Sequence, residues 1–350
     1  MLNRRNFLKS SMTASLAVMA TDTIFAQNSN NSIIKPPALQ KGDTIGLVTP
    51  ASPLFEAQRT IIKATEKMHE LGYKVKLGKN ILKKRGYLAG SIEDRIEDIH
   101  SMFLDDTVKA IMTIRGGYGS GQLLPYLDYN LIARQPKIFM GYSDITSLLI
   151  GMHQKTGLVT FHGPVAISTF TDYTRTYVHK ILQQKSAVGL IEDAPYEDNL
   201  QTSNRVWTYR SGTNKGKLMG GNLTLMQMTL GTPFEFDSDN AILFIEEVGE
   251  EPYDLDRMLN HLKQAGKFDR CQGVFFDKLD SVEPSSYRPA FNSSLSVEEI
   301  IHDIFKDFDF PVCVGLSIGH LKDKPPLPLG IQVRLDATNG QLSFLDSAVA

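Results

Sequence analysis

The sequence predicts an α/β protein whose first half builds a parallel sheet with helices on both faces. Two observations support this fold class. Between residues 43 and 157, short apolar runs alternate with amphipathic segments of helical period, which is typical of parallel sheets. From about residue 217 onward strand-like and helical segments are mixed, and the 350-residue chain is long enough for two domains that each bury a core.

The first half supplies the elements of the parallel sheet. Its predicted strands are residues 43–49, 73–77, 110–114 and 137–140. Its predicted helices are residues 55–71, a segment opened by Ser91, a short helix near Leu123, and a segment just after Ser143. Ser91 with Asp94 resembles a capping box, which marks a helix start. The ligand crevice of such a sheet lies beyond the carboxyl ends of its strands.

The second half is predicted to mix strands and helices. It follows a polar segment rich in Asn and Thr that ends near residue 217, which we interpret as the crossover between domains. Its predicted helices are a short one opened by Gly220-Gly221-Asn222 and a longer one over residues 253–265. Its predicted strands are residues 241–245, 273–276 and 312–316, followed by a terminal hairpin of residues 331–335 and 342–345.

The N-terminus predicts export. Arg4 and Arg5 belong to a twin-arginine pattern, and residues 12–20 form an apolar stretch of small residues. The targeting segment ends near Ala26. This stretch is too short to be a membrane span. We therefore interpret residues 1–26 as a twin-arginine signal peptide and expect a periplasmic mature protein. The alternative is a cytosolic N-terminus that contains two arginines by chance.

Composition excludes several classes of function. Three basic residues and one acidic residue fall in the predicted signal, so the mature chain keeps 34 of 37 basic and 38 of 39 acidic residues, a net charge of −4. No basic stripe predicts nucleic-acid binding. Cys271 and Cys313 lie in or beside apolar runs, which favours buried thiols, although an oxidising compartment would permit a disulfide. No Cys/His spacing predicts a metal site, and no cofactor is expected.

Ser143 is the candidate nucleophile. It follows an apolar strand, a sharp turn at Gly141 and Tyr142, and stands at the mouth of a helix. A serine on such a turn projects from the backbone beside unpaired helix N–H groups, which can hold an oxyanion. The alternative is that Ser143 or Asp144 is simply the N-cap of that helix.

A serine hydroxyl becomes a good nucleophile only beside a base, and the base needs an acid to orient it. The buried run 241–245 ends in Glu246 and Glu247. Strand alternation points these two carboxylates to opposite faces, so only one can serve a given site. A structural role, such as capping a turn or pairing with Arg257, is the alternative for either glutamate.

Two of the eight histidines are candidate bases. His162 and His320 each follow a strand-like run and enter a loop containing Gly or Pro, where rigid strands commonly hold catalytic groups. His320 also completes the chain order serine, acid, histidine found in hydrolases with a nucleophile elbow. The other histidines, His153 among them, are expected on solvated faces.

The glycine-rich segment 115–121 follows the predicted strand 110–114 and can bring bare backbone N–H groups against an anion. It lacks a complete dinucleotide fingerprint and the lysine of a P-loop. We therefore interpret it as an oxyanion or carboxylate cradle. A merely tight turn is the alternative, because glycine serves many turns.

Six ordered motifs carry a family resemblance. They are Ile114-Arg-Gly-Gly-Tyr-Gly, Met140-Gly-Tyr-Ser-Asp-Ile-Thr, Phe161-His-Gly-Pro, Gly220-Gly-Asn-Leu, Phe244-Ile-Glu-Glu-Val-Gly-Glu, and Gly319-His with the later Pro326-Leu-Pro-Leu-Gly. As a set they resemble the LD-carboxypeptidases, or muramoyltetrapeptide carboxypeptidases, a serine peptidase family that also includes microcin self-immunity peptidases. The likeness runs from about Lys41 to Leu345, nearly the whole mature chain.

The resemblance implies a domain organisation. An N-terminal Rossmann-like domain would carry the serine, a smaller mixed α/β C-terminal domain would supply acid and base, and the active site would lie at the domain interface. The expected boundaries are residues 41–185 for the first domain, 186–216 for the linker and 217–348 for the second domain. Members are usually homodimers without metal.

The resemblance also assigns roles. Ser143 would attack the carbonyl, His320 would act as general base and then acid, and Glu246 would orient His320. The backbone N–H groups of Asp144 and of Gly116 or Gly117 would form the oxyanion hole.

The family typically removes the terminal D-alanine from a murein tetrapeptide, and it is commonly described as cytosolic. The export signal therefore puts a role in recycling murein fragments inside the cell in doubt. Within the family, the rival is a peptidase of the microcin-immunity type, against which the absence of Trp from residues 278–296 counts. A rival from another class is a non-catalytic periplasmic peptide-binding protein with two lobes.

Overall fold

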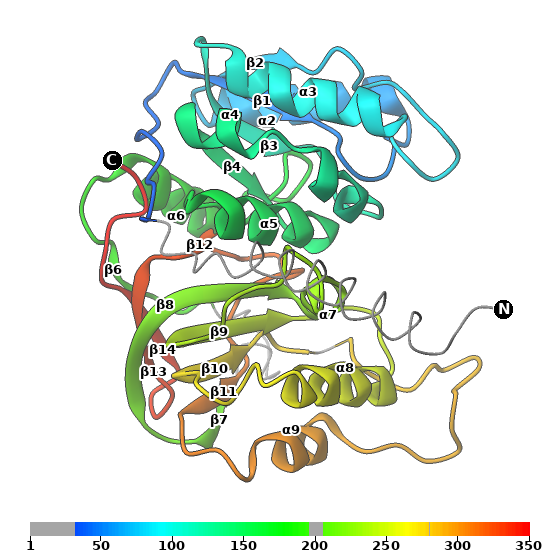
Figure 1. Cartoon of the computed structure of the whole chain (residues 1–350), viewed down its shortest axis with the longest axis vertical. Coiled ribbons are helices and arrows are strands. Elements are labelled where there is room, and N and C mark those ends of the chain that lie inside the picture. The colour runs from blue at the N-terminus through cyan, green and yellow to red at the C-terminus, as the bar shows by residue number, and fades with distance from the viewer. Residues whose placement is uncertain (1–31, 196–205, 280) are drawn as a thin grey trace, which may run out of the picture. The chain divides into compact units, whose positions relative to one another are not determined.

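The computed structural model describes residues 32–195, 206–279 and 281–350. Residues Ile33–Ala350 form one compact unit that contains two β-sheets (Figure 1). The predicted signal peptide, residues 1–26, and part of the predicted linker lie outside the described residues, so export stays a prediction. Among the residues described, no helix combines the length and the apolar character that crossing a bilayer requires.

The first sheet has six strands in the order β12-β5-β4-β3-β1-β2. Five come from the first half of the chain and pair in parallel, as the sequence predicted. They are β1 (Thr44–Val48), β2 (Lys74–Leu77), β3 (Val108–Thr113), β4 (Ile138–Gly141) and β5 (Phe161–His162). The sixth, β12 (Leu327–Pro328), comes from the far end of the chain and pairs antiparallel with β5 at the edge.

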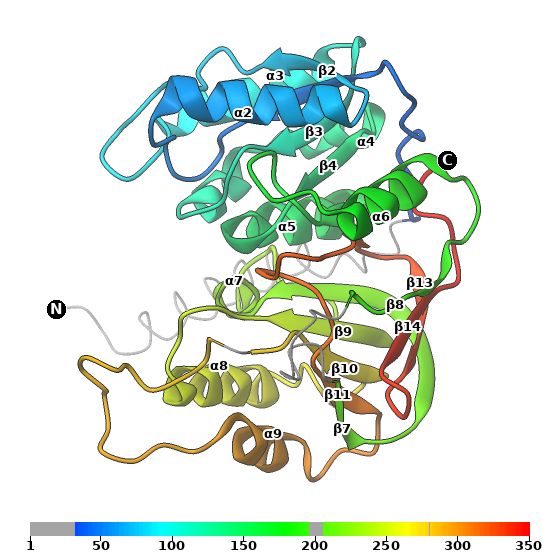
Figure 2. The ribbon, with the colours of Figure 1, turned by 180° about the vertical axis from the view of Figure 1, so that it is seen from behind.

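Helices cover both faces of this sheet, which confirms the predicted fold class. Seen from opposite sides, α3, α4 and α5 cover one face, whereas α2 and α6 cover the other (Figures 1 and 2). Their bounds are α2 (Ala57–Glu70), α3 (Ile92–Leu104), α4 (Tyr129–Arg134), α5 (Thr146–Thr156) and α6 (Asp172–Gln183), with 3₁₀ turns at Ser120–Tyr126 and Ser143–Ile145. The Ser91 and Asp94 capping box opens α3 as predicted.

The second sheet has eight strands in the order β6-β14-β13-β8-β9-β10-β11-β7, of which β8 to β11 pair in parallel. The strands are β6 (Gly189–Ile191), β7 (Trp207–Arg210), β8 (Thr213–Asn222), β9 (Ala241–Glu246), β10 (Gly273–Phe276), β11 (Val312–Val314), β13 (Gln332–Asp336) and β14 (Gln341–Phe344). Its helices are α7 (Leu223–Thr229), α8 (Pro252–Gln264) and α9 (Val297–Phe305). β6 and β7 fall within the predicted linker, and the predicted domain boundaries stay predictions.

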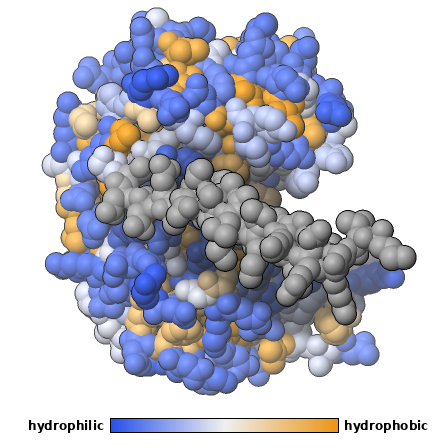
Figure 3. All heavy atoms as spheres, viewed as in Figure 1, coloured by the Kyte–Doolittle hydropathy of each residue, from blue (hydrophilic) through white to orange (hydrophobic). Residues whose placement is uncertain are grey.

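Apolar side chains of both halves are buried between the sheets and their helices. On the face shown in Figure 3, hydrophilic residues cover most of the described surface and apolar residues form separate patches. Cys271 and Cys313 belong to the core as free buried thiols, as favoured from the sequence.

The long strand β8 escaped sequence analysis because three of its ten residues are glycines, which weaken a strand signal. The structure explains these glycines by close backbone approach. A Cβ built on Gly220, whose φ is +147°, would lie only 1.9 Å from the carbonyl oxygen of Phe244 on β9. Only glycine allows the two strands to pair at this point.

Substitution of Gly220 tests this constraint. We expect Gly220→Ala to lower the free energy of unfolding by about 3 kcal/mol or more, because both the positive φ and the carbonyl contact oppose a methyl group. Gly231→Ala is the matched control: its φ is +72° and its Cβ would meet nothing within 4 Å. The control should lose about 1 to 2 kcal/mol. Urea denaturation measures both, and equal losses would contradict the packing argument.

Candidate active site

Ser143 lies in a strained turn between β4 and α5. Its φ is +63°, a left-handed conformation that is uncommon for a residue with a side chain and is often kept at functional sites. Two helical elements begin here, the 3₁₀ turn Ser143–Ile145 and the helix α5, and neither start has a side-chain cap. Neither Ser143 nor Asp144 therefore acts as the N-cap that the alternative interpretation required. The serine therefore has the placement of a nucleophile elbow.

The glycine loop runs directly past this serine. A Cβ on Gly116 would lie 3.1 Å from Ser143 Cβ and 3.4 Å from Ser143 Oγ. At Gly117, whose φ is +118°, a Cβ would lie 2.4 Å from the hydroxyl of Ser52. Within the part of the chain that the structure describes, the backbone N–H groups of Gly116 and Gly117 donate to no protein acceptor. They are therefore available to a ligand beside Ser143.

Asp144 fixes the glycine loop to the serine turn. Its two carboxylate oxygens accept hydrogen bonds from the backbone N–H groups of Gly119 (3.1 Å) and Ser120 (2.8 Å). From the other side, buried Arg95 donates to the carbonyl oxygens of Gly119 (2.9 Å) and Pro50 (3.0 Å). Burial raises the pKa of Asp144 above its usual value, and the hydrogen bonds from Ser120 and Gly119 offset only part of this rise. The side chain of Asp144 thus fixes the position of the glycine loop that lines the site.

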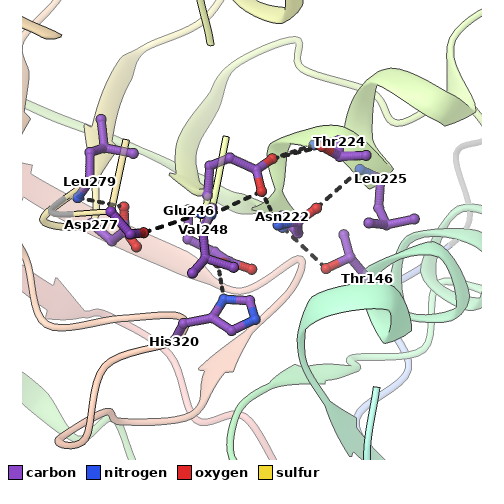
Figure 4. A network of polar contacts seen from close by, with 12 residues as sticks. Thr146, Asn222, Thr224, Leu225, Glu246, Val248, Asp277, Leu279 and His320 are labelled. Carbon is purple, nitrogen blue, oxygen red and sulfur yellow. Dashed lines mark hydrogen bonds and ion pairs between the residues drawn. The ribbon is translucent and has the colours of Figure 1, made fainter. Parts of the chain in front are cut away.

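His320 and Glu246 form the second part of the site. Glu246 ends β9 and is fully buried, and its Oε2 lies 2.7 Å from Nδ1 of His320 (Figure 4). The imidazole is one-quarter exposed. Because Nδ1–H donates to the carboxylate, the neutral ring presents an unprotonated Nε2 that can accept a proton. Gly319 permits this approach, since a Cβ there would lie 2.7 Å from Glu246 Cβ.

The two parts of the site share one cavity of about 390 Å³. Ser143, Gly116, Gly117 and His320 all line it, and the ring of Tyr142 lies edge-on to the ring of His320 with centroids 4.9 Å apart. The residues that line the cavity include no carboxylate and three cations, Arg115, Lys322 and Lys324. No cluster of three or more His, Cys, Asp or Glu side chains that could hold a metal ion occurs among the described residues.

Glu247 points away from His320, as strand alternation predicts. Its Oε1 accepts from the side-chain amide of Asn222 (3.0 Å), and its Oε2 accepts from the N–H (2.9 Å) and hydroxyl (2.8 Å) of Thr224. These bonds anchor the start of α7, as Figure 4 shows for Asn222 and Thr224. Arg257 pairs with Asp254 and with neither glutamate of the strand end.

Asp277 is a buried carboxylate that sequence analysis missed. It follows β10, next to the end of β9, and accepts a hydrogen bond from the N–H of Leu279 (3.1 Å). Burial, and next the charge of Glu246, raise the pKa of Asp277 well above its usual value. The available signal was an apolar strand followed directly by an acid, the same pattern that revealed Glu246.

Two histidines differ from what their sequence surroundings suggested. His153 was expected on a solvated face, and this was wrong. It is only 7% exposed, its Nδ1 lies 2.9 Å from the carbonyl oxygen of Leu158, and Gly330 from the second half lies against its ring. His162, the other candidate base, is buried behind the site between Tyr142 and Phe244 and does not line the cavity. Neither ring nitrogen of His162 has a partner among the described residues.

The protonation of His162 provides a test of this placement. Burial lowers the pKa of His162 to about 4, so we expect a neutral imidazole from pH 5 to pH 8. Because the unfolded chain binds this proton with a pKa near 6.5, the stability that His162 contributes above that pH should be lost as pH falls toward 4. Nitrogen-15 NMR of the imidazole, assigned with His162→Gln, measures the titration. A midpoint above pH 6 would contradict the buried, neutral placement.

Comparisons with known proteins agree with these features. Two family models match the chain: the LD-carboxypeptidase N-terminal domain over residues 45–163 and the LD-carboxypeptidase C-terminal domain over residues 215–335. A relative from Bacillus subtilis (strain 168), described as a probable murein peptide carboxypeptidase, is 40% identical over 302 residues, which cover 86% of this chain and 91% of the relative.

Solved structures share the same fold. The structure of MccF in complex with glutamyl sulfamoyl guanosine superposes with a TM-score of 0.80 at 27% identity, covering 90% of this chain and 99% of that one. The muramoyltetrapeptide carboxypeptidase from Oxalobacter formigenes superposes with a TM-score of 0.72 at 26% identity, covering 86% and 97%. The two family matches and the 40% identical relative together show that this chain belongs to the LD-carboxypeptidase family.

Proposed function

We propose that the chain is a serine LD-carboxypeptidase that removes the C-terminal D-alanine from murein tetrapeptides. One observation carries the proposal: a serine in a strained turn and a carboxylate-bound histidine line the same cavity, although they come from opposite halves of the chain. Family membership and the 40% identical relative described as a probable murein peptide carboxypeptidase support the substrate class. Dimerisation, which the family resemblance implies, stays a prediction.

The proposed mechanism uses groups of the protein and one water molecule. Ser143 Oγ attacks the carbonyl carbon of the L,D bond while His320 Nε2 takes its proton, and Glu246 holds the imidazolium that forms. The oxyanion is stabilised by backbone N–H groups of Asp144 and of Gly116 or Gly117. His320 then protonates the amine of D-alanine, which leaves. Water, activated by the same imidazole, hydrolyses the acyl-enzyme and restores the serine.

A second candidate function is cleavage of an amide next to an acyl-nucleotide, supported by the TM-score of 0.80 to MccF. The two candidates separate on substrate: the first enzyme releases D-alanine from tetrapeptide, whereas the second cleaves an aminoacyl sulfamoyl adenosine. A non-catalytic peptide-binding protein would do neither, and it would not react with a serine-directed phosphonate.

Replacement of the serine tests the proposed function. We expect Ser143→Ala to lower the rate of D-alanine release from purified murein tetrapeptide by several orders of magnitude, leaving the roughly 10³- to 10⁴-fold acceleration over water that binding and an oxyanion hole supply without a nucleophile. Mass spectrometry of the products measures the rate. The variant should also escape labelling by a fluorophosphonate that labels the wild type. Persistent release by a well-folded variant, checked by circular dichroism, would identify another nucleophile.

The adjacent glutamates offer a matched pair of variants. Glu246→Gln should lower kcat by about 10³- to 10⁴-fold with little change in melting temperature, because the amide no longer fixes the reactive tautomer of His320. Glu247→Gln should lower kcat by less than about tenfold but destabilise the fold by about 1 to 3 kcal/mol, because it disturbs the hydrogen bonds at the start of α7. Steady-state kinetics and thermal melts separate the two effects. If Glu246→Gln and Glu247→Gln lowered kcat equally, the proposed role of Glu246 in orienting His320 would be contradicted.

A further inference from the structure

Lys324 is a buried cation on the wall of the catalytic cavity. It lies four residues after His320, in the segment that leads into β12, and only 4% of its surface is exposed. Lysine is almost never buried to this extent without a partner, because removing an ammonium from water is costly. Its presence beside the candidate nucleophile and base therefore requires an explanation.

Among the residues that the structure describes, the ammonium of Lys324 has no hydrogen-bond acceptor. Its backbone N–H donates to the hydroxyl of Thr174 (3.1 Å), and its Nζ lies 4.3 Å from the centre of the Tyr142 ring. Across the three described stretches of the chain, no hydrogen bond or ion pair links this Nζ to a carbonyl or carboxylate. Glu246 is close enough for its charge to raise the pKa of Lys324, but no hydrogen bond joins the two: Oε2 of Glu246 is bound to His320, and its buried Oε1 has no partner among the described residues. The cation–π contact alone leaves the donors of the ammonium unused.

Lys324 is placed to bind a substrate group that lies one residue beyond the bond that is cut. The Tyr142 ring that it covers belongs to the residue directly before Ser143, and the same ring contacts His320. A carboxypeptidase substrate has a single residue after the bond that is cut, so its terminal carboxylate must lie about one residue, roughly 3.8 Å along the chain, from the attacked carbonyl. An unpaired ammonium in the same cavity as Ser143 would bind this carboxylate by a charge-assisted hydrogen bond.

The other two cations of the cavity are less suited to this role. Arg115 donates to the carbonyl oxygen of Pro53 (3.2 Å), and its guanidinium lies 4.8 Å from the ring centre of Phe55. Lys322 is exposed, so its ammonium remains hydrated and an ion pair there would contribute little.

We propose that Lys324 binds the free α-carboxylate of the terminal D-amino acid and so restricts the enzyme to the last peptide bond of its substrate. This inference rests on the proposed carboxypeptidase function and adds to it the group that recognises the chain end. Burial lowers the pKa of Lys324 to about 8, which leaves the ammonium mostly protonated at neutral pH. Lys324 is a binding residue in this scheme, and the proton transfers remain with His320.

The test compares two peptides, the murein tetrapeptide ending in D-alanine and the same peptide ending in D-alaninamide. The wild type should cleave the acid with a kcat/KM about 10- to 100-fold higher than that for the amide, the ratio expected of one charge-assisted hydrogen bond. Lys324→Met should remove this preference by raising KM for the acid, with less than about threefold change for the amide. Lys324→Arg should restore part of the preference, and Lys322→Met, on the same cavity wall, should keep all of it.

A binding measurement separates recognition from turnover. In a Ser143→Ala background, calorimetry should show tighter binding of the acid than of the amide, and the added Lys324→Met change should make the two affinities equal. Thermal melts identify any variant that fails to fold, and Lys324→Arg then provides the comparison. If Lys324→Met lowers kcat/KM equally for both peptides, or if the wild type cleaves both equally, the recognition role is overturned while the proposed function stands. If the wild type cleaves neither peptide, the proposed function itself fails.

Discussion

The contact between Glu246 and His320 is the interaction on which the arrangement of the site depends. A fully buried carboxylate is costly unless it is paired, and here its partner comes from a loop 74 residues later in the chain. The second sheet places Glu246 at the end of a central strand, and Gly319 lets the histidine loop approach to contact distance. The imidazole is then held on both sides, by the carboxylate and by the ring of Tyr142. Removing His320 would leave the buried carboxylate of Glu246 unpaired.

The serine side of the site is built by a different device. The strained φ of Ser143 is maintained because the neighbouring loop is tied to it through Asp144, and that loop is tied to the rest of the sheet through Arg95. Close approach at Gly116 leaves room for little more than backbone beside the hydroxyl. Each half of the site is thus held in place by its own contacts, and such preorganisation stabilises a transition state without reorganisation during the reaction.

Sequence reasoning reached those features whose signal is local. Alternating apolar runs revealed most of the parallel sheet, and the apolar strand before Glu246 and the loop around His320 identified acid and base candidates. Features that depend on tertiary packing were missed. The glycines of β8 weaken its strand signal, and the need for glycine becomes visible only in the fold, where the carbonyl of Phe244 on the neighbouring strand lies against Gly220. Lys324 sits in a charged stretch typical of a solvated loop, but the fold buries it against Tyr142 and Thr174, just before β12 pairs with β5. His153 is buried because the chain's second half covers α5.

The short strand β12 has a consequence for how the molecule divides. The segment that carries His320 and Lys324 begins at β11 in the eight-stranded sheet and ends at β12 in the six-stranded sheet, so it connects the two sheets. The amino-terminal sheet is therefore completed by residues synthesised almost last. A fragment that ended before this connecting segment would leave the backbone of β5 as an open sheet edge, and it would contain Ser143 but lack His320. The six-stranded sheet and the cavity are therefore complete only in a chain that contains both halves.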